Sequence, residues 1–244
     1  MLDAVSPGEH EHFDPVAFLR EKGTLYLLGT ATGASATAGI VAAFIEDVAE
    51  AARRLAAASP RARLDPPLAM VLDEGANYPV LSLPALMSEG GGTGITAAVV
   101  LQSLAQARSK WGQQDAEAIW DSAIVKVVLG GSGNADDLRD LSSLIGTREQ
   151  QQVTTSWGYD GKRSFSMSVQ DKPILEPGQL RTLRFGNAVL LLRSAPPIMM
   201  TLRPWTARQD AAALTASRDE TEMIIREASI QSNASTGSKS RWAG

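Results

Sequence analysis

The feature that most constrains the fold is a run of five mostly apolar residues, Leu-Ala-Met-Val-Leu (68–72), which ends directly in Asp73 and Glu74. A second apolar run, residues 95–101, ends in Gln102. Short apolar runs without alternation indicate strands of a parallel sheet that is buried on both faces. Ligands bind at the carboxyl edge of such sheets, so these strand ends are the first place to look for a functional site.

An apolar strand that ends in Asp-Glu has the form of a Walker B strand. In a nucleoside triphosphatase the Asp helps to hold Mg²⁺, and the Glu polarises the attacking water as a general base. Asp73 is therefore a candidate nucleotide and Mg²⁺ ligand, and Glu74 a candidate catalytic base. The amide of Gln102 could sense the terminal phosphate. The alternative is that Asp73 and Glu74 only end a buried strand where it meets water.

Composition narrows the class of protein. The chain has 244 residues, 44% of them apolar, which suits one large domain or one domain with a tail. The net charge of −4 argues against a protein whose whole surface binds nucleic acid, although it is compatible with a local basic loop. The absence of cysteine excludes disulfides and thiolate metal sites. No apolar run has the length of a membrane span, so we expect a soluble chain.

The order of predicted elements gives an α/β fold. Strand and helix alternate four times, which predicts a three-layer domain over residues 13–205 with a mostly parallel sheet. Residues 1–12 are expected to be irregular. Residues 206–244 are expected to form a weak helix and then, from Ser232, a disordered polar tail. Two further apolar strands, 187–193 and 198–202, predict a hairpin at the sheet edge.

Four local features carry predictions of their own. Residues 24–28 predict a buried strand, and Gly90 to Gly94 are expected to break the chain sharply after a short helix over 81–88. Residues 147–171 predict an exposed β-ribbon or loop, for which a solvated hairpin is favoured over a nucleic-acid contact. The alternating His10-Glu11-His12 would place both rings on one face of a strand, but no third ligand is near, which argues against a metal site.

Several stretches match one known family in combination. They are Phe-Asp-Pro-Val-Ala-Phe-Leu (13–19), Gly-Thr-Leu-Tyr-Leu-Leu-Gly (23–29), Leu-Asp-Pro-Pro-Leu (64–68) with Val-Leu-Asp-Glu (71–74), Leu-Pro-Ala-Leu-Met-Ser-Glu-Gly-Gly-Gly-Thr-Gly-Ile-Thr (83–96), Leu-Gln-Ser-Leu-Ala-Gln-Ala-Arg (101–108), Trp-Gly (111–112), Ala-Ile-Trp-Asp (118–121) and Lys-Val-Val-Leu-Gly-Gly (126–131). Over residues 13–205 the chain resembles the C-terminal half of the TraG/TraD-type coupling ATPases of conjugative type IV secretion, in the actinobacterial form. The matched part includes the TraM-recognition domain.

The resemblance implies a RecA-like P-loop NTPase core, similar to FtsK-type DNA translocases. Members form hexameric rings on the cytoplasmic side of the inner membrane and bind relaxosome proteins of the TraM type. They use ATP and Mg²⁺ to drive single- or double-stranded DNA through the ring pore toward the secretion channel. By motif, Asp73 and Glu74 match the Walker B pair, and Gln102 matches the sensor glutamine.

The chain departs from the family in two places. No Gly-x-x-x-x-Gly-Lys-Ser/Thr phosphate loop occurs in these 244 residues. Many relatives also place an arginine before the glutamine strand to reach a neighbour's nucleotide; here Gly90 to Gly94 stand there, and Arg108 is the substitute candidate.

Three interpretations of function follow. The first is part of a DNA-transfer ATPase that needs an N-terminal half to bind ATP and Mg²⁺, so the chain alone should turn over little ATP. The second is a binding module, a motor remnant that docks relaxosome proteins or ring subunits without hydrolysis. The third is an unrelated α/β protein in which the Asp-Glu pair occurs by chance.

Overall fold

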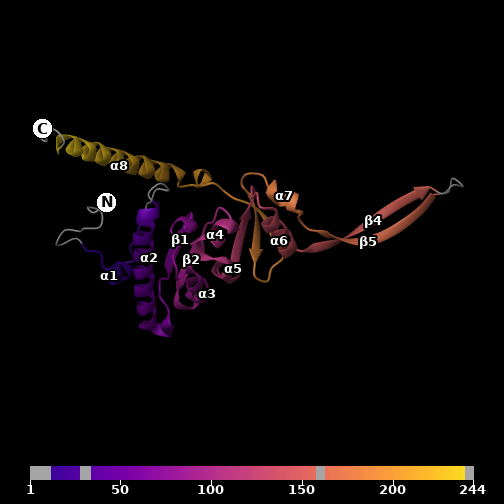
Figure 1. The fold of residues 1–244 in the computed structure, drawn as a ribbon, viewed down its shortest axis with the longest axis horizontal. Helices are drawn as coiled ribbons and strands as arrows, with labels where there is room; N and C mark the ends of the chain where they lie inside the picture. Colours follow the sequence, from indigo (N-terminus) through magenta and orange to yellow (C-terminus); the bar gives the residue numbers. More distant parts are fainter. Residues whose placement is uncertain (1–11, 28–33, 158–162, 240–244) are drawn as a thin grey trace. The chain divides into compact units, whose positions relative to one another are not determined.

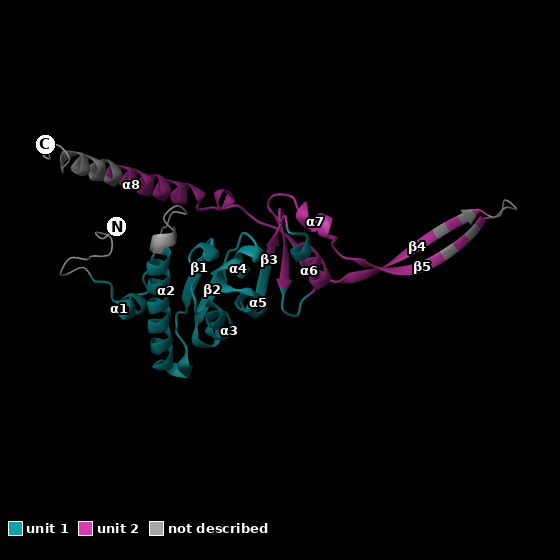
Figure 2. Cartoon of the chain, viewed as in Figure 1, with its two compact units in different colours: residues 1–126, 134–137, 192–195 teal, residues 127–133, 138–191, 196–244 magenta. Residues whose placement is uncertain are grey.

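The structure is a computed structural model that describes residues 12–27, 34–157 and 163–239 (Figure 1). The chain divides into two compact units (Figure 2). Unit 1 comprises residues 1–126, 134–137 and 192–195, and unit 2 comprises residues 127–133, 138–191 and 196–244. Each unit is described by itself below.

Unit 1 holds the predicted Asp-Glu strand and the helices around it. Its elements are α1 (Pro15–Arg20), α2 (Ala34–Ala57), η3 (Pro60–Ala62), β1 (Leu68–Leu72), η4 (Gly75–Asn77), α3 (Leu83–Thr93), β2 (Ile95–Val99), α4 (Leu104–Trp111) and α5 (Gln113–Ser122). Helix α1 is capped by Asp14, which accepts two backbone hydrogen bonds at 2.8 and 3.2 Å, and Pro15 occupies its first turn. The ring of Phe13 then joins this helix to α2 by packing on Phe44, with centroids 5.0 Å apart.

Strands β1 and β2 form the predicted parallel pair. Leu68 pairs with Ile95 and Leu72 with Val99, so the two strands run together over their full length. The core of unit 1 lies against one face of this pair. Its buried members come from α2, β1, the segment before α3, α3, β2 and α5: Ala49, Ala52, Met70, Val80, Leu83, Leu86, Ile95 and Ile119.

The opposite face of the β1–β2 pair is open among the described residues. Val71 on β1 is 73% exposed, and Ala69, Thr96 and Ala98 are exposed beside it. The two runs are apolar on both faces, which is typical of a parallel sheet covered on both sides. In the described part of unit 1, helices cover only one face of the β1–β2 pair.

The glycine cluster does not break the chain where the sequence predicts. Helix α3 continues through Gly90, Gly91 and Gly92 and ends at Thr93, and Gly94 follows with φ of 81°. A Cβ at position 90 would lie 2.5 Å from the carbonyl oxygen of Ile95, whereas positions 91 and 92 have open space around them. Gly90 therefore allows the helix to pack closely on the start of β2, and Gly94 supplies the left-handed turn that ends the helix.

The prediction of a buried strand over residues 24–28 is wrong for the described part. Residues 24–27 form no regular structure and are exposed, with Tyr26 at 81%. A strand needs a neighbour for its backbone hydrogen bonds, and β1 pairs only with β2 in the described ranges. Leu28 and the loop of residues 29–33 lie outside the described residues.

Two elements have residues in both units: β3 (Val125–Leu129) and α6 (Ala135–Ile145). The remaining elements of unit 2 are β4 (Thr147–Trp157), β5 (Arg163–Pro173), α7 (Pro177–Arg181), β6 (Asn187–Leu192, whose last residue falls in unit 1), β7 (Ile198–Thr201), η5 (Trp205–Ala207) and α8 (Ala211–Lys239). The sheet order is β3-β6-β7. Strands β6 and β7 are antiparallel, which confirms the predicted hairpin.

Strands β4 and β5 form the predicted ribbon. They are antiparallel and paired from Thr147 with Pro173 to Trp157 with Arg163. No other described helix or strand packs extensively against this ribbon, which extends from the rest of unit 2 (Figure 2). Its tip, residues 158–162, lies outside the described residues.

Helix α8 continues further than the sequence predicts. It runs to Lys239, so residues 232–239 are helical where a disordered tail is expected. Extending a helix by one residue costs little once the helix is nucleated, and no proline interrupts this stretch. None of the helices in the described ranges has the length and apolar character needed to cross a membrane.

Candidate functional site

The candidate site lies at the carboxyl ends of β1 and β2. The ladder continues past both strands, because the Val100 amide donates to the Leu72 carbonyl at 2.9 Å and the Gly75 amide donates to the Val100 carbonyl at 3.1 Å. These bonds fix the backbone on either side of Asp73 and Glu74. Gly75 is buried, and a Cβ there would lie 3.1 Å from Val99, so this turn packs tightly on β2.

Glu74 and Gln102 meet at this edge. The Gln102 amide Nε2 donates to Glu74 Oε1 at 3.1 Å. The other carboxylate oxygen, Oε2, accepts a hydrogen bond of 2.7 Å from Asn77 Nδ2. Glu74 has φ of 49° and ψ of 42°, a left-handed conformation that is uncommon outside glycine and often marks functional sites. The backbone thus holds the Glu74 carboxylate between two side-chain amides.

Asn77 and Gln106 belong to the same network and are absent from the sequence prediction. Gln106 Nε2 donates to Asn77 Oδ1 at 3.4 Å. Gln106 is itself fixed by the start of α4, where the hydroxyl of the N-cap Ser103 accepts a hydrogen bond from the Gln106 backbone N–H at 3.1 Å. The available signal was proximity along the chain: Asn77 follows Glu74 by three residues, and Gln106 lies in the first turn of the helix that begins directly after Gln102 and Ser103.

Asp73 is exposed beside Glu74, and its Oδ1 accepts the Glu74 backbone hydrogen at 3.1 Å. No group of three or more carboxylate, histidine or cysteine residues in the described ranges could enclose a metal ion. Mg²⁺, however, commonly binds proteins through one or two carboxylates and completes its shell with phosphates and water. Asp73 fits that minimal role. His12 takes part in no such group, and His10 and Glu11 lie outside the described residues.

Arg108 is engaged within unit 1. Its guanidinium Nη1 donates to Asp137 Oδ1 at 2.9 Å, and the Asp137 side chain is only 5% exposed. Withdrawing Arg108 would leave a buried carboxylate without its cation, which costs about 3–5 kcal/mol. The geometry shows Arg108 as the partner of Asp137; its predicted reach to a neighbouring subunit stays a prediction.

A cavity of about 1080 Å³ adjoins the two acidic residues. It runs along β1 and is lined on the other side by the inner face of α2 and by part of residues 18–27. Its lining includes Asp73, Glu74 and Gly75, and also apolar side chains such as Ile45 and Leu55. Its volume is that of a small-molecule pocket, and its acidic residues lie at the end of β1.

Comparison with known proteins identifies the region that surrounds this site. Residues 67–185 match the family described as the TraM recognition site of TraD and TraG. The conjugal transfer protein TraG of Rhizobium radiobacter is 26% identical over 147 residues, which is 59% of this chain and 23% of that protein. TraG of Agrobacterium fabrum is also 26% identical, over 22% of its length. Residues 67–185 are thus similar to the C-terminal domain of TraG/TraD-type proteins.

Solved structures show the fold that this chain shares. The unbound bacterial conjugative coupling protein TrwBΔN70 superposes with a TM-score of 0.65 and 21% identity, over 82% of this chain and 46% of TrwBΔN70. TrwB in complex with ADP and Mg²⁺ gives a TM-score of 0.61 and 22% identity over 82% of this chain. The expected RecA-like α/β class is thereby confirmed. The chain spans less than a quarter of these TraG proteins and less than half of TrwBΔN70.

Proposed function

We propose that the chain is the C-terminal part of the motor of a conjugative coupling protein, an ATP-driven DNA translocase that links the relaxosome to the type IV secretion channel. The observation that carries the proposal is the contact of Gln102 with Glu74, beside Asp73, at the ends of two paired parallel strands. An acidic pair and a neutral amide at this edge are among the groups that nucleoside triphosphatases use for phosphoanhydride hydrolysis.

Each side chain has a chemical task in this proposal. Asp73 would hold Mg²⁺, which neutralises phosphate charge when it is bound. Glu74 would orient and deprotonate the attacking water. The Gln102 amide donates to Glu74 Oε1 in this structure. A terminal phosphate oxygen would compete for the same amide, and the competition would free Glu74 Oε1 to accept from water.

The open face of the β1–β2 pair supports the proposal that another part of the motor protein completes this site. Val71 is 73% exposed although it belongs to a parallel sheet, and such sheets are almost always covered on both faces. We propose that the remainder of a TraG-type motor, including its phosphate-binding loop, covers this face. The limited share of the TraG and TrwB chains that this sequence spans is consistent with that proposal.

The assembly proposed for the complete protein follows the TraG/TraD pattern. Six copies would form a ring on the cytoplasmic side of the inner membrane, with DNA in the pore. A relaxosome protein of the TraM type would be a partner, which the match of residues 67–185 to a TraM recognition site supports.

The test is ATP hydrolysis by a fusion of this chain to a TraG N-terminal segment that carries a Gly-x-x-x-x-Gly-Lys-Ser/Thr loop. Glu74→Gln should lower kcat by about 10²–10⁴-fold, the usual contribution of a general base, and leave nucleotide binding intact. Glu89→Gln is the matched control. Glu89 is an exposed carboxylate on α3, outside the candidate site, so its replacement should leave kcat unchanged. Equal turnover by the Glu74→Gln fusion and the parent fusion would refute the proposal.

A second function, a non-hydrolysing module that docks relaxosome proteins or ring subunits, is favoured by one observation. Both oxygens of Glu74 accept amide hydrogen bonds, and Arg108 is paired with Asp137, so these groups already have structural partners. In that case the fusion would bind a TraM-type protein but hydrolyse no ATP, and Glu74→Gln would change neither property.

A further inference from the structure

The ribbon of β4 and β5 has two chemically different faces. Residues that are directly paired across an antiparallel ribbon point to the same face. One face, here called the apolar face, therefore carries Glu149, Gln151, Val153, Thr155 and Trp157 from β4 and Arg163, Phe165, Met167, Val169 and Asp171 from β5. The other face carries polar side chains that include Gln150, Gln152, Ser168 and Gln170.

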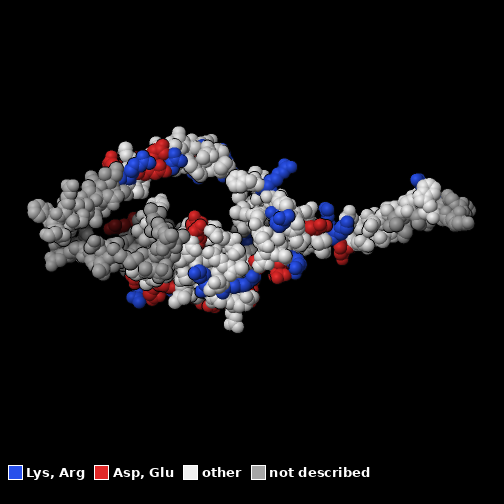
Figure 3. Space-filling view, turned by 45° about the horizontal axis from the view of Figure 1, so that its top comes forward, with Lys and Arg blue, Asp and Glu red and all other residues white. Residues whose placement is uncertain are grey.

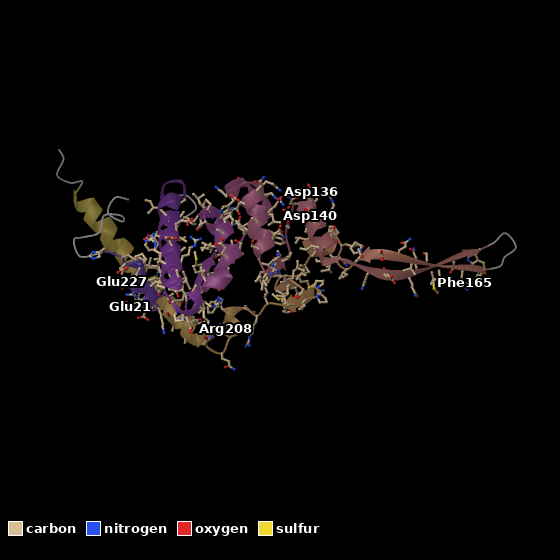
Figure 4. The ribbon with its side chains drawn as sticks, turned by 90° about the horizontal axis from the view of Figure 1, so that it is seen from below. Glu21, Asp136, Asp140, Phe165, Arg208 and Glu227 are labelled. Atoms are coloured by element: carbon tan, nitrogen blue, oxygen red, sulfur yellow. The ribbon has the colours of Figure 1, made fainter. Side chains whose placement is uncertain are left out.

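The apolar face is uncovered among the described residues. Trp157, Phe165 and Met167 are each 67% exposed, and Val153 and Val169 are also more than half exposed. Figure 4 shows Phe165 near the outer end of the ribbon, with no other drawn side chains packed over it. A two-stranded ribbon alone is marginally stable in water, and contiguous exposed apolar patches mark binding surfaces. The face thus has the character of an interface.

The charges on this face disfavour nucleic acid as its occupant. Glu149 and Asp171 lie on one rung near the base of the ribbon, and Arg163 lies near the tip, so the apolar face carries one positive and two negative charges. Binding to phosphates requires a basic surface. In Figure 3 the charged side chains of the ribbon gather near its base, and its outer described part is almost uncharged. These charges favour a protein surface as the occupant.

We propose that the occupant is the same face of a second copy of this chain, packed face to face about a two-fold axis with the ribbons antiparallel. If the ribbons were parallel, the two-fold axis would run along the strands, so that Arg163 would face Trp157 of the second copy and Glu149 would face its Asp171. The antiparallel arrangement, centred on the rung of Val153 and Met167, instead places Arg163 over Asp171 of the second copy.

The remaining rungs fit the same arrangement. With Met167 on the axis, Met167 contacts its own copy, and Phe165 lies over Val169 of the second ribbon. Arg163 already lies over the Trp157 ring, 4.6 Å from its centroid, so this aromatic ring and cation would enter the interface as one preorganised surface.

The size of the face sets the expected affinity. Two aromatic side chains bury about 150–250 Å² each, and three aliphatic or thioether side chains add to them. Two such faces bury roughly 1,000 Å² together, which is the lower end of specific interfaces and corresponds to weak, micromolar association. A two-fold contact closes after two copies. It uses only the ribbon and is independent of the proposed motor function.

Sedimentation of the purified chain from 1 to about 100 µM tests the association. We expect a monomer–dimer equilibrium that Phe165→Glu weakens at least tenfold, whereas Gln152→Glu on the opposite face leaves it unchanged. Phe165 is exposed in the single chain, so circular dichroism should be the same for both variants. A monomer at every concentration, or a Phe165→Glu chain that dimerises as tightly as the parent, would overturn the proposal. So would a monomeric chain whose apolar face binds single-stranded DNA or another protein.

Two further variants test the geometry. Arg163→Glu should weaken the dimer at least tenfold, and adding Glu149→Lys and Asp171→Lys should restore it; failure of this restoration refutes the antiparallel register. The chain has no cysteine, so Met167→Cys and Ser168→Cys each supply a single thiol. A short bis-maleimide should link two copies of the Met167→Cys chain and leave the Ser168→Cys chain unlinked, because stacked sheets lie about 10 Å apart. Equal cross-linking at both positions would contradict a contact through the apolar face.

Discussion

Gly90→Ala tests how α3 is joined to the strand that carries Gln102. The new Cβ would lie 2.5 Å from the backbone oxygen of Ile95, whereas carbon and oxygen ordinarily approach to about 3.3 Å. The helix or the strand must therefore shift by about 0.8 Å, given that difference. Ile95 is only 2% exposed and belongs to the core, so the surroundings can yield little.

Gly91→Ala is the matched control, because it lies one residue away in the same helix with nothing within 4 Å of the new Cβ. Replacing glycine by alanine inside a helix stabilises by about 0.8–1 kcal/mol. Gly90→Ala gains the same term but adds an overpacking cost of about 1–3 kcal/mol or more. The free energies of unfolding of the two variants should thus differ by about 1–3 kcal/mol, with Gly90→Ala the less stable.

Urea unfolding measures this difference in a background that keeps Trp111 as its only tryptophan. Trp111 reports on unit 1, because its indole donates to the Val80 carbonyl at 2.9 Å and packs on the core. With a slope of about 1–3 kcal/mol per molar urea, the two midpoints should be separated by roughly 1 M. If Gly90→Ala and Gly91→Ala unfold at the same urea concentration, the close approach of α3 and β2 is wrong.

Three other predictions have distinct expected outcomes. Arg108→Ala should lower the free energy of unfolding by about 3–5 kcal/mol because it leaves the buried Asp137 carboxylate without its cation. Arg54→Ala, which breaks an exposed ion pair, should change the free energy of unfolding by less than about 1 kcal/mol. Equal losses for the two variants in urea titrations would refute the pairing of Arg108 with a buried Asp137. Gly94→Ala should cost more than about 1–2 kcal/mol, since φ is 81° and the new Cβ would lie 2.7 Å from a backbone oxygen; an unchanged melting midpoint would contradict that turn. Val71→Ser should change the free energy of unfolding of this chain by less than about 0.5 kcal/mol, because the Val71 side chain is exposed. The same substitution should destabilise the fusion with a TraG N-terminal segment by about 1.5–3 kcal/mol if that segment buries Val71. The same small effect in the chain and in the fusion would show that this face of the β1–β2 pair stays open.

Local signals predicted the parts of the fold that local chemistry decides. The apolar runs gave β1 and β2, and their parallel pairing brought Glu74 to Gln102. The Ser103 hydroxyl caps α4, and Gly112, which lacks a Cβ and has φ of 84°, ends it.

The errors arose where distant residues decide the outcome. Gly90 was interpreted as a chain break, but its role depends on the carbonyl of Ile95, which only the folded chain places nearby. The strand over residues 24–28 had the right composition, but the described residues offer it no paired neighbour. The sequence gives no sign that Arg108 forms an ion pair with Asp137, because Asp137 is 29 residues away along the chain. Asn77 could have been noticed from its spacing to Glu74, but its hydrogen bond is a property of the turn that η4 forms.

The central claim is that Asp73 and Glu74 form one half of a nucleotide site. Calorimetric titration of a non-hydrolysable ATP analogue with Mg²⁺ tests it most directly, first into this chain and then into its mixture with a TraG N-terminal segment that carries the phosphate loop. The account predicts no measurable binding to the chain alone and binding to the mixture that is tighter than to the segment alone, with Asp73→Asn abolishing the gain. Binding to the mixture that equals binding to the segment, or that is unchanged by Asp73→Asn, would contradict it.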